Sequence, residues 1–219
     1  MKRIALVSVT LNAVNPMTKY LMEQAADLTV VNYLDSYLLE KVRKDGKITD
    51  ESMGRMFQML TQACADGADG IILTCTIFSP YVESFSNLLS VPIICPDGAM
   101  LDMVSKEEGK TAILCTFEGT VETTRNLYLS YCEQNKTSKE VDMIVVPGAY
   151  EAAGRGDMKQ SYKLILHKVK ELDAFYDKIV LAQISMSEAV EGYTSDHAVI
   201  FTSPSSAYKV MMERINVHV

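Results

Sequence analysis

Cys75 is the residue of this sequence that is best placed to do chemistry. It stands between two threonines at the end of the apolar run 70–73, which has the length and composition of a buried parallel strand. The turn signal Ser79-Pro80 and a segment with helical character follow. Ligands of open α/β sheets bind at the carboxyl ends of the strands, and the positive end of a following helix favours a thiolate. We therefore expect Cys75 to be a reactive thiol.

A second stretch, residues 178–183, has the same shape and places Gln183 at the position that matches Cys75. Four pairs of positions near strand ends share one offset of 108 residues: Ser8 and Thr116, Asn12 and Thr120, Cys75 and Gln183, Pro96 and Pro204. A fixed offset at corresponding places indicates two copies of one α/β unit. Side-chain identity between the copies is low, so this prediction rests on register.

The elements that position these residues alternate between strands and helices along the chain. The predicted strands are apolar runs that end in polar or turn residues: 3–9, 28–33, 70–75, 91–96, 111–116, 141–146, 178–183 and 198–204. The predicted helices cover about 16–26, 36–43, 49–65, 80–89, 120–133, 158–173 and 205–214. Residues 147–157 are rich in glycine and are predicted to form a mobile loop. The alternation predicts an α/β fold with mostly parallel sheets and right-handed crossovers.

Two such units facing each other would form a cleft lined by residues from the strand ends. The first unit would contribute Ser8, Thr10, Asn12, Cys75 and Thr76, and the second Thr116, Phe117, Thr120, Gln183, Ile184 and Ser185. Backbone N–H groups of these loops, together with Thr76, Thr116 and Thr120, could hold a carboxylate. Ser8 and Asn12 could contact the rest of a substrate, or could equally serve turns and helix caps.

The composition excludes several classes of protein. The chain has 219 residues, 48% of them hydrophobic and 22% charged, which is ordinary for a soluble globular protein of one large or two small domains. The net charge of −7 and the absence of a basic stripe argue against nucleic-acid binding. No apolar run approaches the ~20 residues of a membrane span. The start of the chain is predicted to be a first strand and not a signal peptide.

The other cysteines and the histidines show no pattern of a site. Cys64, Cys95, Cys115 and Cys132 are expected to fill the core, because free cysteine is among the most buried residue types. Five cysteines without C-x-x-C spacing predict neither a disulfide framework nor a zinc site, and the three histidines are scattered. This cysteine usage favours a cytoplasmic location.

Four segments together resemble the aspartate/glutamate/hydantoin racemase superfamily of cofactor-independent enzymes. They are Leu73-Thr74-Cys75-Thr76, Leu114-Cys115-Thr116-Phe117-Glu118-Gly119-Thr120, Val180-Leu181-Ala182-Gln183-Ile184-Ser185 and Ser203-Pro204-Ser205-Ser206-Ala207. The resemblance lies in their order and spacing, and it covers essentially the whole chain.

The resemblance implies two pseudo-symmetric flavodoxin-like lobes with the active site between them, residues 1–96 plus about 205–219 and residues 97–204. It implies a small carboxylate or amino-acid substrate and no cofactor. Racemases of the family use two cysteines, one per lobe: one thiolate takes the Cα proton and the other thiol returns a proton on the opposite face. The resemblance makes Cys75 the first of these. Dimers are common in the family, so we expect a homodimer.

Gln183 departs from the family pattern, since the second cysteine belongs at this position. An amide cannot exchange a proton near neutral pH, so two-base racemisation is not expected. The leading interpretation is a cofactor-independent enzyme of this superfamily that uses Cys75 at the carbon next to the carboxylate of a small amino acid or carboxylate. The alternatives are a one-cysteine decarboxylase, a cis–trans isomerase with Cys75 as nucleophile, and a carboxylate-binding protein without turnover. Ser185, Ser187 and Glu188 are the candidates in the following loop for a replacement proton donor.

Overall fold

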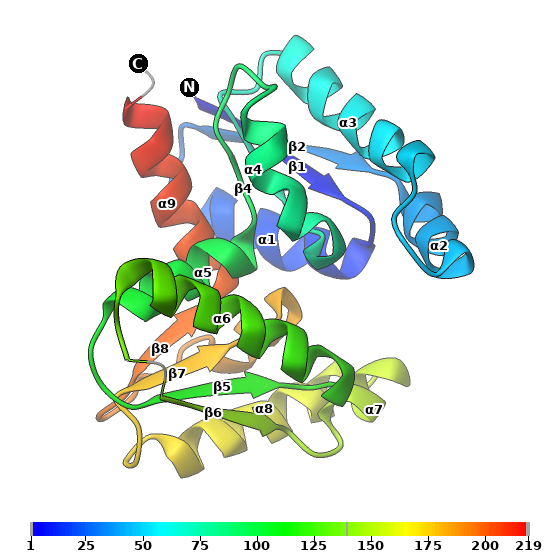
Figure 1. The fold of residues 1–219 in the computed structure, drawn as a ribbon. Helices are drawn as coiled ribbons and strands as arrows, with labels where there is room; N and C mark the ends of the chain where they lie inside the picture. The colour runs from blue at the N-terminus through cyan, green and yellow to red at the C-terminus, as the bar shows by residue number, and fades with distance from the viewer. Residues whose placement is uncertain (1, 139, 218–219) are drawn as a thin grey trace. The chain divides into compact units, whose positions relative to one another are not determined.

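The computed structural model describes residues 2–138 and 140–217, and its elements form two parallel sheets (Figure 1). In the described residues each sheet has four strands, with the orders β2-β1-β3-β4 and β6-β5-β7-β8. The two orders are the same pattern repeated, so the duplication predicted from the offset of 108 is present in the fold. The chain divides into two compact units, Met1–Pro96 with Ala207–Val219, and Asp97–Ser206. We call them unit 1 and unit 2.

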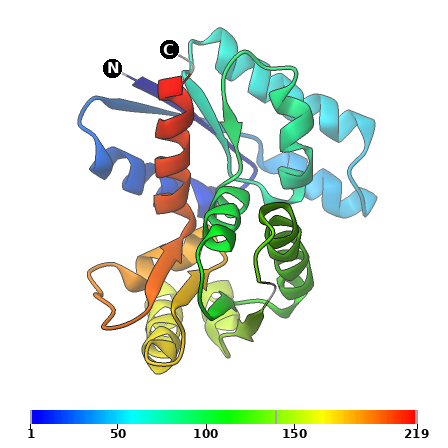
Figure 2. The same ribbon diagram turned by 60° about the vertical axis from the view of Figure 1, so that its left-hand side comes forward.

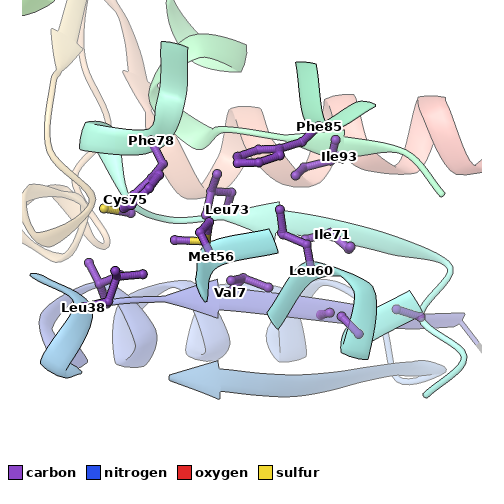
Figure 3. Packing of buried hydrophobic residues seen from close by; sticks show 14 of the residues in the cluster. Val7, Leu38, Met56, Leu60, Ile71, Leu73, Cys75, Phe78, Phe85 and Ile93 are labelled. Atoms are coloured by element: carbon purple, nitrogen blue, oxygen red, sulfur yellow. The ribbon is translucent and has the colours of Figure 1, made fainter. Parts of the chain in front are cut away.

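Unit 1 is built around two strands whose side chains are almost all buried. Its elements are β1 (Lys2–Ser8), α1 (Leu11–Gln24), β2 (Leu28–Leu34), α2 (Ser36–Asp45), α3 (Asp50–Ala65), β3 (Gly70–Leu73), the 3₁₀ helix η1 (Thr76–Tyr81), α4 (Val82–Ser86) and β4 (Ile93–Ile94). Helices cover both faces of the sheet, α3 on one and α1 on the other (Figures 1 and 3). Coverage of both faces explains why β1 and β3 are continuous apolar runs.

Helix α3 packs on the sheet through apolar residues along one face. Met56 and Leu60 are fully buried against β1 and β3 (Figure 3). Phe57 stacks on Phe85 of α4 with ring centroids 6.1 Å apart. The helix begins at a capping box: the Thr49 side chain accepts from the Ser52 N–H, and the Ser52 side chain accepts from the Thr49 N–H. This cap satisfies two N–H groups that the helix itself leaves unpaired.

Unit 2 repeats the arrangement. Its elements are α5 (Pro96–Lys106), β5 (Thr111–Cys115), η2 (Glu118–Thr120), α6 (Val121–Asn135), β6 (Val141–Val145), α7 (Ala149–Gly154), α8 (Met158–Leu172), β7 (Lys178–Leu181), η3 (Ile184–Val190), β8 (Val199–Thr202) and the start of α9 (Ser203–Val217). One face of the sheet packs on α7 and α8, and the other on α5 and α6. Figure 2 shows both layers around the strands. In the described residues, no helix is long and apolar enough to cross a membrane.

The last helix of each repeat belongs to the other unit, and we call α5 and α9 the exchanged helices. Helix α5 follows β4 of unit 1, yet its residues from Asp97 onward belong to unit 2; α9 follows β8, yet from Ala207 it belongs to unit 1. Met211 of α9 lies over Gly70, where any Cβ would collide with its sulfur. Lys178 is buried and donates to the carbonyls of Val104 (3.2 Å) and Glu107 at the end of α5. These contacts fix each exchanged helix to a strand of its adopted unit.

Several predicted elements differ from those observed. Helix α1 begins at Leu11 and contains Pro16, because the chain turns into the helix directly after the extended residue Thr10. Helix α5 was not predicted, although Pro96 at its first position is a start signal. The predicted loop 147–157 contains α7, since Ala149 and Ala152 are buried against the core of unit 2 and Gly148, with φ 75°, supplies the left-handed turn before it. Helix α9 begins at Ser203 and not at about 205.

Asp173, which follows α8, fixes the loop that leads into β8. Its carboxylate accepts hydrogen bonds from the hydroxyls of Ser195 and Tyr193 and from the N–H groups of Asp196, His197 and Ala198. The bonds from Ser195 and from these N–H groups favour the charged form, so they hold the pKa of Asp173 well below its ordinary value. The loop is thus tied to one ionised side chain.

Replacing Asp173 by alanine is expected to lower the free energy of unfolding by about 2–4 kcal/mol near neutral pH, because five donors lose their acceptor. The pKa is lowered on folding, so this contribution is complete above the ordinary value of ~4 and is lost as the pH falls below it toward the folded pKa. Urea unfolding of both proteins should therefore show a smaller difference at about pH 3 than near neutral pH. The exposed Asp196, replaced by alanine, is the control and should change stability by less than about 0.5 kcal/mol; equal losses would contradict the prediction.

Candidate functional site

The strand order places the candidate residues at the switch point of each sheet. In the order β2-β1-β3-β4, the connections from β1 and β3 leave in opposite directions, and ligands of such sheets bind beyond the carboxyl ends of those two strands. Ser8 ends β1 and Cys75 follows β3 in unit 1. Thr116 follows β5 and Gln183 follows β7 in unit 2. Each unit therefore brings one predicted pair to its own switch point.

In unit 1, Ser8 bridges the switch point from inside the protein. Its hydroxyl lies 2.8 Å from the hydroxyl of Thr74, and the Thr74 N–H donates to the Val7 carbonyl at 3.0 Å. Ser8 has no exposed surface and Thr74 is 8% exposed. This pair joins the ends of β1 and β3, so the geometry gives Ser8 a positioning role. Thr74 was not singled out from the sequence, although its place beside Cys75 was a signal.

Cys75 lies at the start of η1 and packs beside Phe78 (Figure 3). The side chain is 5% exposed, and the Cys75 carbonyl accepts from the Phe78 N–H at 3.0 Å. In place of the helix predicted over 80–89, the chain forms the six-residue 3₁₀ helix η1 and the five-residue α4. A dipole needs aligned peptide units over a longer helix, so the expected stabilisation of a thiolate by a helix N-terminus is not supported here.

The neighbours of Cys75 in the predicted set are more open. Thr76 is exposed and Thr10 is half-buried, so both hydroxyls are at the surface of unit 1. The side chain of Asn12 lies outside what the structure describes. Cys95, predicted to be core, is 6% exposed at the end of β4, where its thiol contacts the Leu73 carbonyl at 3.2 Å and the Ser79 hydroxyl.

In unit 2, Gln183 is held in one orientation by Thr116. Its Oε1 accepts from the Thr116 N–H at 2.9 Å and from the Thr116 hydroxyl at 2.7 Å. A backbone N–H can only donate, so the atom facing it must be the amide oxygen and the NH₂ group must point away. Both donors of Thr116 are engaged in this way. An amide whose N–H donors point away from Thr116 thus stands at the position that matches Cys75.

The turn after β5 contains Thr120 and Phe117. The Thr120 hydroxyl donates to the Phe117 carbonyl at 2.8 Å and, like Thr124, also contacts the Cys115 thiol. Burial raises the pKa of Cys115 above its ordinary value, because the thiolate would lose its hydration. Cys115 is fully buried and fills the core, as the sequence predicts. The Phe117 ring is 43% exposed and stacks on Tyr150, a contact that the sequence did not reveal.

The turn after β7 is η3, which packs on α8. Ile184 and Ser185 are half-buried there, and the Ser187 hydroxyl donates to the Ile184 carbonyl at 2.8 Å. Glu188 accepts a hydrogen bond from Tyr162 of α8. Burial and this bond together raise the pKa of Tyr162. Glu188, a candidate for the missing proton donor, is therefore engaged on the α8 side of the turn.

The remaining titratable groups give no sign of a bound metal. Across residues 2–138 and 140–217, no three His, Cys, Asp or Glu side chains come close enough together to hold a metal ion. The groups that the switch points offer are a thiol, hydroxyls, an amide and backbone N–H groups. Such groups can bind a carboxylate and move a proton.

The chain was compared with protein families, curated proteins and solved structures. The family model described as Asp/Glu/Hydantoin racemase matches residues 5–207. No curated protein matches the chain. Among solved structures, aspartate racemase of Picrophilus torridus is similar with a TM-score of 0.72 and 12% identity, over 99% of this chain and 95% of that one.

Two further structures show the same fold. Allantoin racemase of Klebsiella pneumoniae is similar with a TM-score of 0.68 and 14% identity, over 100% of this chain and 89% of that one. Glutamate racemase isoform RacE1 of Bacillus anthracis has a TM-score of 0.68 and 13% identity, over 99% of this chain and 82% of that one. The family model matches nearly the whole length of the chain, so the chain belongs to the Asp/Glu/hydantoin racemase family.

Proposed function

We propose that the protein is a cofactor-independent enzyme that moves a proton at the carbon next to the carboxylate of a small amino acid or carboxylate. This proposal gives Cys75 the role of acid and base and Gln183 the role of hydrogen-bond donor. The observation that carries it is the orientation of Gln183, whose amide NH₂ points away from the Thr116 donors that hold its oxygen. Family membership supports the reaction class.

The proposed reaction has two steps. The Cys75 thiolate takes the Cα proton, and the electron pair of the C–H bond moves into the carboxylate to give an enediolate. The Gln183 N–H groups donate to an oxygen on which negative charge grows, and this favours the transition state over the bound substrate. The S–H of Cys75 exchanges its proton with solvent, and the thiol then returns a proton to Cα and becomes a thiolate again.

A single thiol limits the stereochemical result. Gln183 cannot supply a proton, and Glu188 is engaged by Tyr162. The proton is then removed from and returned to the same face of Cα. Hydrogen exchange with solvent at Cα is therefore faster than inversion of its configuration. The decarboxylase and isomerase alternatives also require Cys75, either to protonate a carbanion or to add to an unsaturated carbon. The binding-protein alternative requires no thiol.

The test is to incubate the wild-type protein in D₂O with single enantiomers of alanine, phenylalanine, aspartate and glutamate. Proton NMR follows deuterium at Cα, and chiral chromatography follows inversion. We expect exchange to be at least about 10-fold faster than inversion for the substrate, as one-face proton transfer requires. Equal rates would contradict the single-thiol reaction and favour two bases. A saturable rise in melting temperature without exchange would favour the binding protein.

A further inference from the structure

Two aromatic rings form a stacked pair at the switch-point edge of unit 2. Phe117 of the β5 turn and Tyr150 of α7 have ring centroids 4.7 Å apart and an interplanar angle of 28°. They are 43% and 49% exposed, so half of a large apolar surface remains open to solvent. Phe117 directly follows Thr116, the residue that orients Gln183. The open rings thus lie in the same loop system as the amide donors.

The Phe117 ring also lies against Gly119. A Cβ at Gly119 would collide with the Phe117 ring carbons, which shows that the ring lies directly on the glycine. A ring that already packs on Tyr150 and Gly119 loses less entropy when a ligand contacts its open surface. This pair is therefore a preformed apolar surface, and not a mobile side chain at the end of a loop.

The charges near the carboxyl ends of the strands disfavour a second carboxylate on the substrate. The five residues after each strand, in both units, contain no Lys or Arg, although 21 such residues in 219 would place about four there by chance. Arg55 reaches the β2 edge from α3, but it is paired with Asp35. Glu118 and Glu151, both exposed, each follow one ring of the stacked pair. A carboxylate near the rings would meet like charges and no unpaired cation from these loops.

We infer that the substrate carries a single carboxylate and a flat apolar group that stacks on Phe117 and Tyr150. This inference rests on the proposed function, because it assigns the Gln183 N–H groups to that carboxylate. Aromatic stacking adds a favourable contribution to the burial of apolar area. Aspartate and glutamate lack the ring and bring a second charge toward Glu118 and Glu151. Phe117 is thus a specificity-determining residue.

Binding is measured by calorimetry in the Cys75→Ser variant, which separates affinity from turnover. The probes are L-phenylalanine, L-alanine and L-aspartate. We expect phenylalanine to bind about 10-fold more tightly than aspartate, since tenfold corresponds to 1.4 kcal/mol. In the Cys75→Ser background, the Phe117→Ala substitution should weaken the binding of phenylalanine about 10-fold. It should weaken the binding of free alanine by less than about twofold. Gly119→Ala should act in the same direction because it displaces the ring, and Phe117→Tyr should restore binding.

Phe175→Ala is the matched control, since this ring is 70% exposed and lies after α8. It should leave all three affinities unchanged, and melting curves check that every variant is folded. Any of three results would overturn the inference. Aspartate could bind as tightly as phenylalanine, the Phe117→Ala substitution could weaken the binding of all probes equally, or no probe could bind. The expected order of affinities without Cα exchange in the wild type would count against the proposed reaction alone.

Discussion

Replacing Cys75 by serine is expected to lower the rate of Cα deuterium exchange by about 10³-fold. General acid–base catalysis contributes about 10²–10⁴-fold, and a serine hydroxyl is too weak an acid to replace a thiol near neutral pH. The substitution is nearly isosteric, and Cys75 is 5% exposed beside Phe78, so the fold should be retained. Exchange is measured by NMR at saturating substrate, and substrate affinity by calorimetry.

Cys64→Ser is the control for this experiment. Cys64 is half-buried on α3 and lies at neither switch point, so its loss should change exchange by less than about twofold and stability by about 1 kcal/mol. A Cys75→Ser variant that keeps exchange within tenfold of the wild type would show that the thiol does not carry the proton. A large loss of melting temperature in that variant would call for Cys75→Ala, for which the same loss of exchange is expected.

Replacing Gln183 by glutamate is expected to reduce kcat/KM by about 10²–10³-fold, the effect of removing one donor to a developing oxyanion. The new side chain has the same shape, and one of its oxygens can still accept from the N–H and hydroxyl of Thr116. The other oxygen would present a negative charge where the amide presents two donors. Both kcat and the affinity for the substrate should decrease, because the bound carboxylate and the enediolate both meet that charge.

Gln134→Glu is the matched control for the change of charge, because Gln134 is exposed on α6. Steady-state exchange rates at several substrate concentrations separate kcat from KM for both variants. A Gln183→Glu protein with unchanged kcat and KM would contradict the role given to the amide. Partial recovery at low pH, where the new carboxyl is protonated and can donate, would support it.

Much of the fold could be predicted from the sequence because its strands are buried on both faces. Such strands are continuous apolar runs, and β3 and β7 begin at Gly70 and Lys178, the predicted offset of 108. The offset fails for β6, which begins at Val141 and not 108 residues after Leu28, because the connection before it is longer. Helix α7 was missed because it has only six residues beside glycines, too few to show a helical pattern, and its stability comes from packing against the core of unit 2.

The candidate site could be predicted as a set of positions but not as an arrangement. Strand ends and the offset identified Cys75 and Gln183 without any side-chain geometry. Pattern and propensity do not determine rotamers, so the bond from Thr116 that turns the amide outward was not foreseen. The burial of Ser8 against Thr74 was hidden for the same reason, because a strand-end serine can point either way.

The exchanged helices also set the order in which the two units can be completed during synthesis. Unit 2 is one contiguous segment, Asp97–Ser206, and its last residue is synthesised before Met211. Unit 1 holds the first residues of the chain, yet the cover over Gly70 comes from α9. Apolar surface that stays exposed until its packing partner is synthesised is prone to aggregation. The half that is translated first is therefore the half that is finished last.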